Sequence, residues 1–260
     1  MIDWLYSLPE LAILAIGASM MAAAILIMPS LVHRLPRLRP GNENTDFVLR
    51  MQATLFTMIS LVLAFSLIET ESNFRKVDAL ISNEASQINR LDRLLTRYDD
   101  PAAVGIRTHL LTYANSVVQD EWPSMLRGVA SDKTRQAFVP ISRGILAMEP
   151  KAGRQTTIYG EILRSFDAIA ESRDSRISIV QVSLPPIYWQ VVLFAVLMLL
   201  FISSTMERST FRSYVLAAQM AVLGAFISFV FIMDQPFKGE SAVDAQPIVQ
   251  TIALMKARGS

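Results

Sequence analysis

The stretch that decides the fold of this 260-residue chain is MQATLFTMISLVLAFSLIETESNFRKVDALISNEASQINRLDRLLTRY, residues 51–98. Its first part, residues 51–68, has no charge and is close to the length that a helix needs to cross a membrane. Its second part places apolar side chains at the a and d positions of a heptad, as helices that pack against other helices do. These are Phe74, Val77, Ile81, Ile88, Leu91, Leu95 and Tyr98. We therefore predict that this span leaves the membrane and continues as one helix to about Tyr98.

Three further stretches are apolar enough to span a membrane as helices, residues 11–32, 187–206 and 213–233. The composition agrees, because 52% hydrophobic residues and a mean hydropathy of +0.37 exceed the values of soluble proteins. We expect an integral membrane protein with four spans, of which residues 51–68 form the second.

Residues 70–184, between spans two and three, have 15 Lys+Arg and 14 Asp+Glu and read as a domain outside the membrane. After the helix-breaking Asp99-Asp100-Pro101, heptad spacing predicts three more helices. They contain Ile106, Leu110, Tyr113 and Val117 up to Trp122-Pro123, then Phe138, Ile141, Ile145 and Met148 up to Pro150, then about Arg154 to Val180. The prediction is an all-α protein with an antiparallel four-helix bundle inserted between spans two and three, in which the first helix continues span two and the last helix continues into span three.

The expected parts of the chain are spans one and two in residues 1–69 and the bundle in residues 70–184. Spans three and four follow in residues 185–235, and residues 236–260 form a C-terminal segment.

Composition and motifs exclude several functions. A net charge of +1, from 24 Lys+Arg and 23 Asp+Glu, is too small for nucleic-acid binding. The chain has no Cys, and His33 and His109 lie too far apart in sequence to bind a metal from one helix. The glycines lack the spacing of a dinucleotide fingerprint, a phosphate loop or a nucleophile elbow. We therefore expect no nucleic-acid partner, metal, cofactor or catalytic residue, and no enzyme.

One heptad core position carries an acid, Glu84. A buried carboxylate must be paired or protonated, and counting 1.5 Å per residue brings Arg173 of the last bundle helix to a similar level. We therefore predict a Glu84–Arg173 ion pair, and by the same count Arg176 could meet Glu121. These four residues could form a structural lock on the helix register, or a charged gate or ligand site at the base of the bundle.

Arginines are concentrated in two short connections on one side of the membrane, residues 33–50 and 207–212. They are Arg34, Arg37, Arg39, Arg50, Arg208 and Arg212. Short cytoplasmic connections carry an excess of Lys and Arg, so this side is expected to be cytoplasmic and the bundle external. Basic residues also flank the spans on the bundle side, which makes the difference between the two sides small.

No ionisable residue lies within the spans, which argues against a coupled transporter or a proton pump. A pore lined by hydroxyls and apolar rings is compatible with the second span. The candidate pore-lining residues are Thr54, Thr57 and Ser60, with Phe56 or Phe65 as constrictions. Ordinary helix packing is the alternative for each of them. Small residues also give spans one, two and four packing faces, for contacts within one protomer or between protomers.

Several separated motifs resemble the bestrophin-like family of bacterial membrane proteins. They are Asn83-Glu84-Ala85, Tyr113, Glu121-Trp122-Pro123, Arg173 with Arg176, Leu184-Pro185-Pro186 with Trp189, and Asp234-Gln235-Pro236-Phe237-Lys238-Gly239. The likeness extends over nearly the whole chain. It implies a distant similarity to bestrophins, which are pentameric anion channels with four spans, a helical domain between spans two and three, and a pore lined by the second span.

The chain also departs from bestrophins. Its helical insertion is shorter, Lys238 interrupts the Pro-Phe-Gly segment after the fourth span, and Glu240 and Asp244 form no acidic cluster for calcium. The resemblance implies a cytosolic helical domain, whereas the arginines favour the external side. Asp234 is expected to accept backbone hydrogen bonds in the turn that follows it. Alternatively, Asp234, Phe237 and Lys238 lie at a pore mouth, where Lys238 would attract anions.

The leading hypothesis is an oligomeric ion channel of the bacterial cytoplasmic membrane, with a pore along the second span. The resemblance adds five subunits and a preference for anions. The expected partners are the lipid bilayer, further copies of the chain and inorganic anions. The alternative is a non-conducting, membrane-anchored helical bundle that acts as a sensor or scaffold, for which a monomer or dimer is expected.

Overall fold

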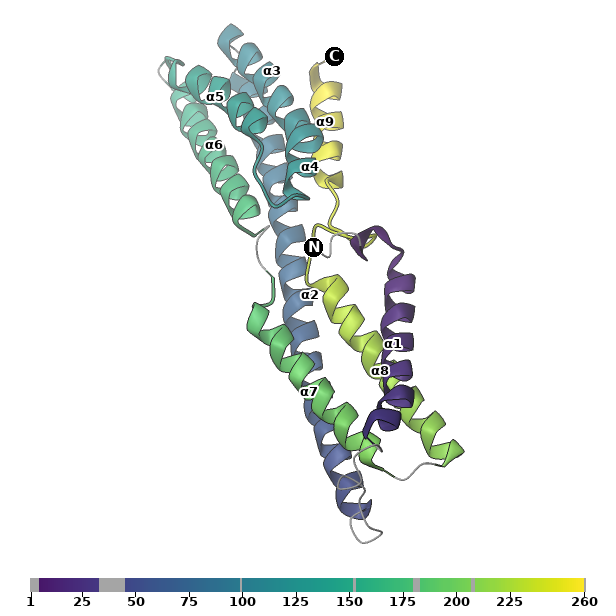
Figure 1. Cartoon of the computed structure of the whole chain (residues 1–260). Coiled ribbons are helices and arrows are strands. Elements are labelled where there is room, and N and C mark those ends of the chain that lie inside the picture. Colours follow the sequence, from purple (N-terminus) through teal and green to yellow (C-terminus); the bar gives the residue numbers. More distant parts are fainter. Residues whose placement is uncertain are drawn as a thin grey trace. The chain divides into compact units, whose positions relative to one another are not determined.

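The computed structural model describes residues 5–32, 45–98, 100–151, 153–179, 183–206 and 209–259. These ranges are helical with short connections and contain no strand, which confirms the all-α fold class. The chain forms two compact units, and helix α2 contributes to both (Figure 1). We call residues 1–72 with 183–241 the membrane unit, and residues 73–182 with 242–260 the bundle unit.

The membrane unit contains the four predicted spans. After the short 3₁₀ turn η1 (Leu5–Ser7), they are α1 (Glu10–Val32), the first part of α2 (Thr45–Tyr98), α7 (Pro186–Thr205) and α8 (Thr210–Met233). Each contains a window with a mean hydropathy between 1.9 and 2.5, so each is long and apolar enough to cross a membrane.

Two glycines let α1 and α8 pack backbone against backbone. A Cβ atom added to Gly17 would overlap Ser228 Oγ, and one added to Gly224 would overlap the carbonyl oxygen of Gly17. Small residues permit such close approach, which stabilises helix pairs in lipid. The two contact positions therefore require glycine.

Helix α2 runs from Thr45 to Tyr98 over 54 residues without a break (Figure 1). At 1.5 Å per residue this corresponds to about 80 Å of helix. The prediction that the second span and the first bundle helix are one element is confirmed.

The bundle unit combines the second part of α2 with five α-helices and one π-helical segment. They are α3 (Pro101–Ser116), the π segment η4 (Val117–Glu121), α4 (Trp122–Met125), α5 (Asp132–Leu146), α6 (Arg154–Ile179) and α9 (Gln246–Gly259). Capping residues start two of these helices. Asp100 accepts from the N–H of Ala102 at the start of α3, and Ser131 accepts from the N–H of Thr134 at the start of α5.

The second bundle helix ends close to the predicted Trp122-Pro123, but its course is irregular and continues two residues further. The chain continues from α3 through η4 into α4, which ends at Met125. Pro123 lies in the first turn of α4, where a missing N–H costs no hydrogen bond. A proline therefore does not stop the chain from remaining helical here.

Helix α9 belongs to the bundle unit, and the sequence analysis predicted neither this helix nor its docking. It buries Ile248, Ile252 and Met255, and the hydroxyl of Thr251 donates to the carbonyl oxygen of Ala85 on α2 (3.3 Å). The C-terminal segment that was expected in residues 236–260 thus contributes a packed helix.

Some expectations concern residues outside the described ranges. These are His33, Arg34, Arg37, Arg39, Asp99, Val180 and Arg208. Of the arginines that set the predicted orientation, Arg50 and Arg212 are described, and both are exposed.

Candidate functional site: an ionic cluster and the face of the second span

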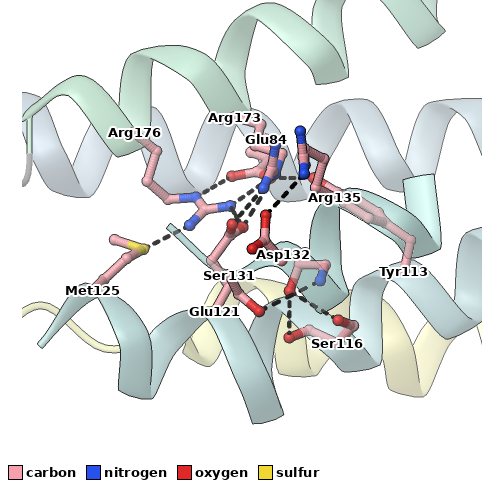
Figure 2. Close-up of polar contacts among 11 residues, drawn as sticks. Glu84, Tyr113, Ser116, Glu121, Met125, Ser131, Asp132, Arg135, Arg173 and Arg176 are labelled. Atoms are coloured by element: carbon pink, nitrogen blue, oxygen red, sulfur yellow. Dashed lines mark hydrogen bonds and ion pairs between the residues drawn. The ribbon is translucent and has the colours of Figure 1, made fainter. Parts of the chain in front are cut away.

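Five polar side chains from four elements meet in the core of the bundle unit (Figure 2). They are Glu84 on α2, Tyr113 on α3, Glu121 on η4, and Arg173 and Arg176 on α6. We call them the ionic cluster. Four of them have no exposed surface, and Arg173 is 9% exposed.

Arg176 lies at the centre of the cluster. Its Nε and Nη2 donate to Oε2 and Oε1 of Glu84 at 2.6 and 3.1 Å, and Nη2 also donates to Oε2 of Glu121 at 2.9 Å. Its Nη1 faces Sδ of Met125 at 2.7 Å. The Tyr113 hydroxyl donates to Oε1 of Glu84 at 2.9 Å. Every guanidinium nitrogen of Arg176 therefore has an acceptor, as a buried charge requires.

Arg173 completes the charge balance. Its Nη2 and Nε donate to Oε1 and Oε2 of Glu121 at 2.5 and 3.3 Å, in the two-point geometry that favours arginine–carboxylate pairs. Two guanidinium groups thus face two carboxylates, and the cluster has no net charge.

The four predicted ion-pair residues meet, and the predicted Arg176–Glu121 contact is present at 2.9 Å, but Glu84 has a different partner from the predicted one. Glu84 pairs with Arg176 rather than Arg173, and Arg173 pairs with Glu121. The residue count assumed that the last bundle helix continues into the third span. Instead α6 ends before residues 183–185, which are not helical. A non-helical residue can advance the chain by about 3.5 Å, whereas a helical residue advances it by about 1.5 Å. The residues of α6 are therefore displaced along α2 by about one helical turn from the positions that the count gave.

The placement of Glu121 depends on the π segment η4. The N–H of Trp122 donates to the carbonyl oxygen of Val117, five residues earlier. Pro123 follows, and its ring would clash with the carbonyl four residues before it in a regular α-helix. The wide π turn contains one extra residue, which rotates the neighbouring side chains around the helix axis. In this arrangement Glu121 is fully buried. The sequence signal for this irregularity was Trp122-Pro123, which we had read as a helix end.

Tyr113 and Arg176 keep their protons at physiological pH. Burial raises the pKa of the Tyr113 hydroxyl well above its ordinary value of 10.0, and the charge of Glu84 raises it further. Burial alone would lower the pKa of Arg176, but Glu84 and Glu121 outweigh this effect and raise it. Tyr113 is therefore a neutral donor and Arg176 a cation. In the described ranges, no three His, Asp or Glu side chains are placed to bind a metal ion.

Another buried carboxylate, Asp92 on α2, joins α3 and α9. It is 1% exposed and accepts from Nε of Arg107 at 2.9 Å and from Nε of Arg258 at 2.8 Å. Arg258 also donates to Oδ1 of Asn89 at 2.5 Å. The sequence carried no signal for these contacts, because Arg258 lies 166 residues beyond Asp92.

Three of the candidate pore residues lie on an exposed face of α2 in the membrane unit. They are Thr54, Thr57 and Phe65, and Phe65 is 65% exposed. The hydroxyls of Thr54 and Thr57 donate to the carbonyl oxygens of Arg50 and Ala53, both at 2.9 Å. Both hydroxyls are therefore satisfied within the helix.

The other two candidates face α8. Phe56 and Ser60 are half-buried and line a largely apolar pocket of about 340 Å³. Val222, Leu223 and Phe226 of α8 close its other side. The five candidates thus occupy two different faces of α2.

The residues after α8 are held inside the membrane unit. Asp234 accepts from the N–H of Leu184 at 2.6 Å, not from the turn that follows it, because α7 begins beside the end of α8. Phe237 is 4% exposed, and Nζ of Lys238 lies 5.6 Å from the ring centre of Tyr6. Within one protomer, Asp234 and Phe237 are therefore packing residues.

Solved structures with the same fold are bacterial bestrophin homologues from Klebsiella pneumoniae. One has a TM-score of 0.69 at 12% identity, and the match covers 95% of this chain and 98% of the other. A second has a TM-score of 0.67 at 14% identity, and a third 0.64 at 13%, both with the same coverage. This likeness shows the bestrophin fold, with four helices long and apolar enough to span a membrane and an inserted helical bundle.

The family follows from the sequence. The model of the Bestrophin-like domain matches residues 16–248, so the chain belongs to the Bestrophin-like family. This confirms the resemblance that the separated motifs carry. A search of curated proteins found no match.

Proposed function

We propose that the chain is the subunit of an oligomeric ion channel whose pore is lined by the second span. The proposal is carried by the exposed face of α2 with Thr54, Thr57 and Phe65. Its hydroxyls are already bonded to helix carbonyls, so the face can meet water or another subunit without leaving a polar group unpaired. Around a shared axis, several copies of this face would line a path with small polar side chains and with apolar rings as constrictions.

The finer features of the proposal rest on the resemblance to bestrophins and on the arginines. From bestrophins we take five subunits and a preference for anions. From the charges of the short connections, including Arg50 and Arg212, we take a bundle on the external side of the bacterial cytoplasmic membrane.

The ionic cluster has a structural part in this proposal. It joins α2 to α3, η4 and α6 through buried, charge-assisted hydrogen bonds. A channel needs its pore-lining helix in a fixed rotation and register, and the cluster supplies such a constraint in the bundle unit.

Reconstitution in liposomes tests the function. We expect chloride flux above that of protein-free vesicles, and a detergent-solubilised mass of five 29.0 kDa chains. No flux in any tested state, together with a monomeric or dimeric mass, would instead support a membrane-anchored sensor or scaffold.

Cysteine substitution tests the pore face, because the chain has no native Cys. A water-soluble thiol reagent should block flux through Thr54→Cys and Thr57→Cys. Val62→Cys is the matched control, since Val62 is 41% exposed and lies about 80° and about 140° around the helix from Thr54 and Thr57, so it should face lipid. Equal block at all three positions would contradict the assignment of this face to the pore.

The orientation has a separate test. Ala147 is exposed at the end of α5, so Ala147→Cys should react with a membrane-impermeant maleimide in intact cells. Labelling that requires cell lysis would place the bundle in the cytosol instead.

A further inference from the structure

We infer that three arginines on the bundle part of α2 form a surface that collects small inorganic anions. They are Arg90, Arg93 and Arg97, and we call them the arginine row. This inference rests on the proposed channel function. It assigns to the bundle part of α2 the surface that would attract anions to this helix.

The row lies on a strip of α2 that its neighbours leave uncovered. On one side, α6 contacts α2 through the Asn83–Ser172 hydrogen bond at 3.2 Å. On the other side, α9 contacts α2 through Thr251 and Ala85. Between these contacts, helical periodicity places the row in line with two exposed serines. The exposed strip consists of Ser82, Ser86, Arg90, Arg93 and Arg97.

The positive charge of the strip is compensated only in part. Arg90 pairs with Glu161 at 2.6 Å, whereas Arg93 and Arg97 have no ion-pair partner among the described residues. The two acids of this stretch, Glu84 and Asp92, are buried and paired with arginines of other helices. Asp99 and Asp100 follow Arg97 in the sequence, so the exposed charge without a nearby acid is centred on Arg93.

A structural role explains the row only in part. Arg97 lies in the last turn of α2, where the helix dipole favours a cation. Arg93 lies one turn earlier, and like charges four residues apart on a helix repel each other. A repulsive pair on an open surface raises the local concentration of anions. In an oligomer the contributions of several copies would add, and the small side chains of Ser82 and Ser86 leave room beside the row.

A cysteine placed beside the arginine row measures the local electrostatic potential. This measurement does not require the protein to conduct ions. Ser86→Cys places a thiol two turns from Arg93 on the same face, about 10 Å along the helix. At about 10 mM ionic strength, Arg93→Gln with Arg97→Gln should slow the reaction with an anionic thiol reagent by about two-fold or more. The rate with a neutral reagent should not change. Removal of two exposed arginines elsewhere, Arg143→Gln with Arg154→Gln, is the control for net charge and should have no such effect.

Permeability separates this inference from the channel proposal. In planar bilayers, Arg93→Gln with Arg97→Gln should lower the chloride-to-potassium permeability ratio by about two-fold, and the control pair should not. If the wild type conducts but the reagent rates and the ratio are unchanged, the arginine row fails and the channel stands. If the reagent rates fall as expected but no variant conducts, the row attracts anions and the channel proposal fails.

Discussion

The membrane unit and the bundle unit hold their helices together by different interactions. In the membrane unit, α1 and α8 meet at Gly17 and Gly224, and a neutral amide pair, Gln52 with Gln219 at 2.8 Å, joins α2 to α8. In the bundle unit, the ionic cluster buries two guanidinium groups and two carboxylates. Apolar side chains gain little when they leave lipid for another helix, so shape selects partners in the membrane. In water, apolar burial stabilises the bundle, and paired charges can select which helices meet.

The largest expected effect is the loss of the central cation of the bundle unit. Arg176→Met strands the buried charge of Glu84 and should destabilise the protein by about 3–5 kcal/mol. Chemical unfolding followed by circular dichroism in detergent measures the loss. Arg164→Met is the control on the same helix, because Arg164 is exposed and should contribute less than about 1 kcal/mol.

The pairing itself is tested by a double-mutant cycle. Glu84→Gln combined with Arg176→Met removes both charges, so it should cost less than the sum of the single losses. Additive losses would show that the two residues do not interact.

In the membrane unit the largest effect should come from a glycine. Gly224→Leu forces the backbones of α1 and α8 apart and should cost about 3 kcal/mol, the upper end of overpacking. Thermal unfolding in detergent measures it. Gly160→Ala on α6 is the matched change, since nothing lies within 4 Å of its added Cβ, and it should stabilise the bundle by about 0.5–1 kcal/mol. A tolerated Gly224→Leu would remove the contrast between the two units.

Removal of the Tyr113 hydroxyl tests how much its hydrogen bond to Glu84 stabilises the bundle. Tyr113→Phe removes a hydrogen bond to the ionised Glu84 and should cost about 1.5–2 kcal/mol at neutral pH. An unchanged midpoint of chemical unfolding would argue that Arg176 alone satisfies this carboxylate.

The same hydroxyl should make the bundle sensitive to alkali. The folded pKa of Tyr113 lies above its ordinary value of 10.0, so the unfolded chain loses this proton first. The stabilisation is therefore complete below about pH 10 and is lost as the pH rises from there toward the folded pKa. We expect Tyr113→Phe to lose less stability than the wild type between pH 10 and 11, and parallel pH profiles would contradict this.

The smallest expected effect concerns α9. Arg258→Gln leaves Asp92 paired with Arg107, and the Arg258 side chain is 28% exposed, so the loss should be about 0.5 kcal/mol. Hydrogen exchange of the α9 amides would show whether the helix opens more often. Lys256→Gln is the control on the same helix, because Lys256 is exposed.

The sequence predicted the elements whose signal is local. The charge-free spans and the heptad of α2 fixed the helices and the unbroken run to Tyr98, because hydropathy and periodicity depend on neighbours along the chain. The burial of Glu84 also followed from its heptad position. Its partner did not, because a few non-helical residues between α6 and α7 were enough to exchange Arg173 for Arg176.

Two further features could not be predicted from the sequence, because they also depend on more than local periodicity. The phase of Glu121 depends on the π segment before Pro123, and proline is compatible with either a helix end or a new first turn. The packing of α9 depends on contacts such as Arg258 with Asp92, whose partners lie far apart in the chain.

Residue patterns thus sufficed for an all-α chain with four spans and a helical insertion, since uninterrupted apolar stretches reveal the spans and heptad spacing reveals the first four bundle helices. Which carboxylate meets which arginine, where a helix widens into a π turn, and where the last helix docks depended on folding in three dimensions. Those outcomes turn on shifts of one helical turn and on contacts between distant segments, and neither leaves a periodic trace in the order of amino acids.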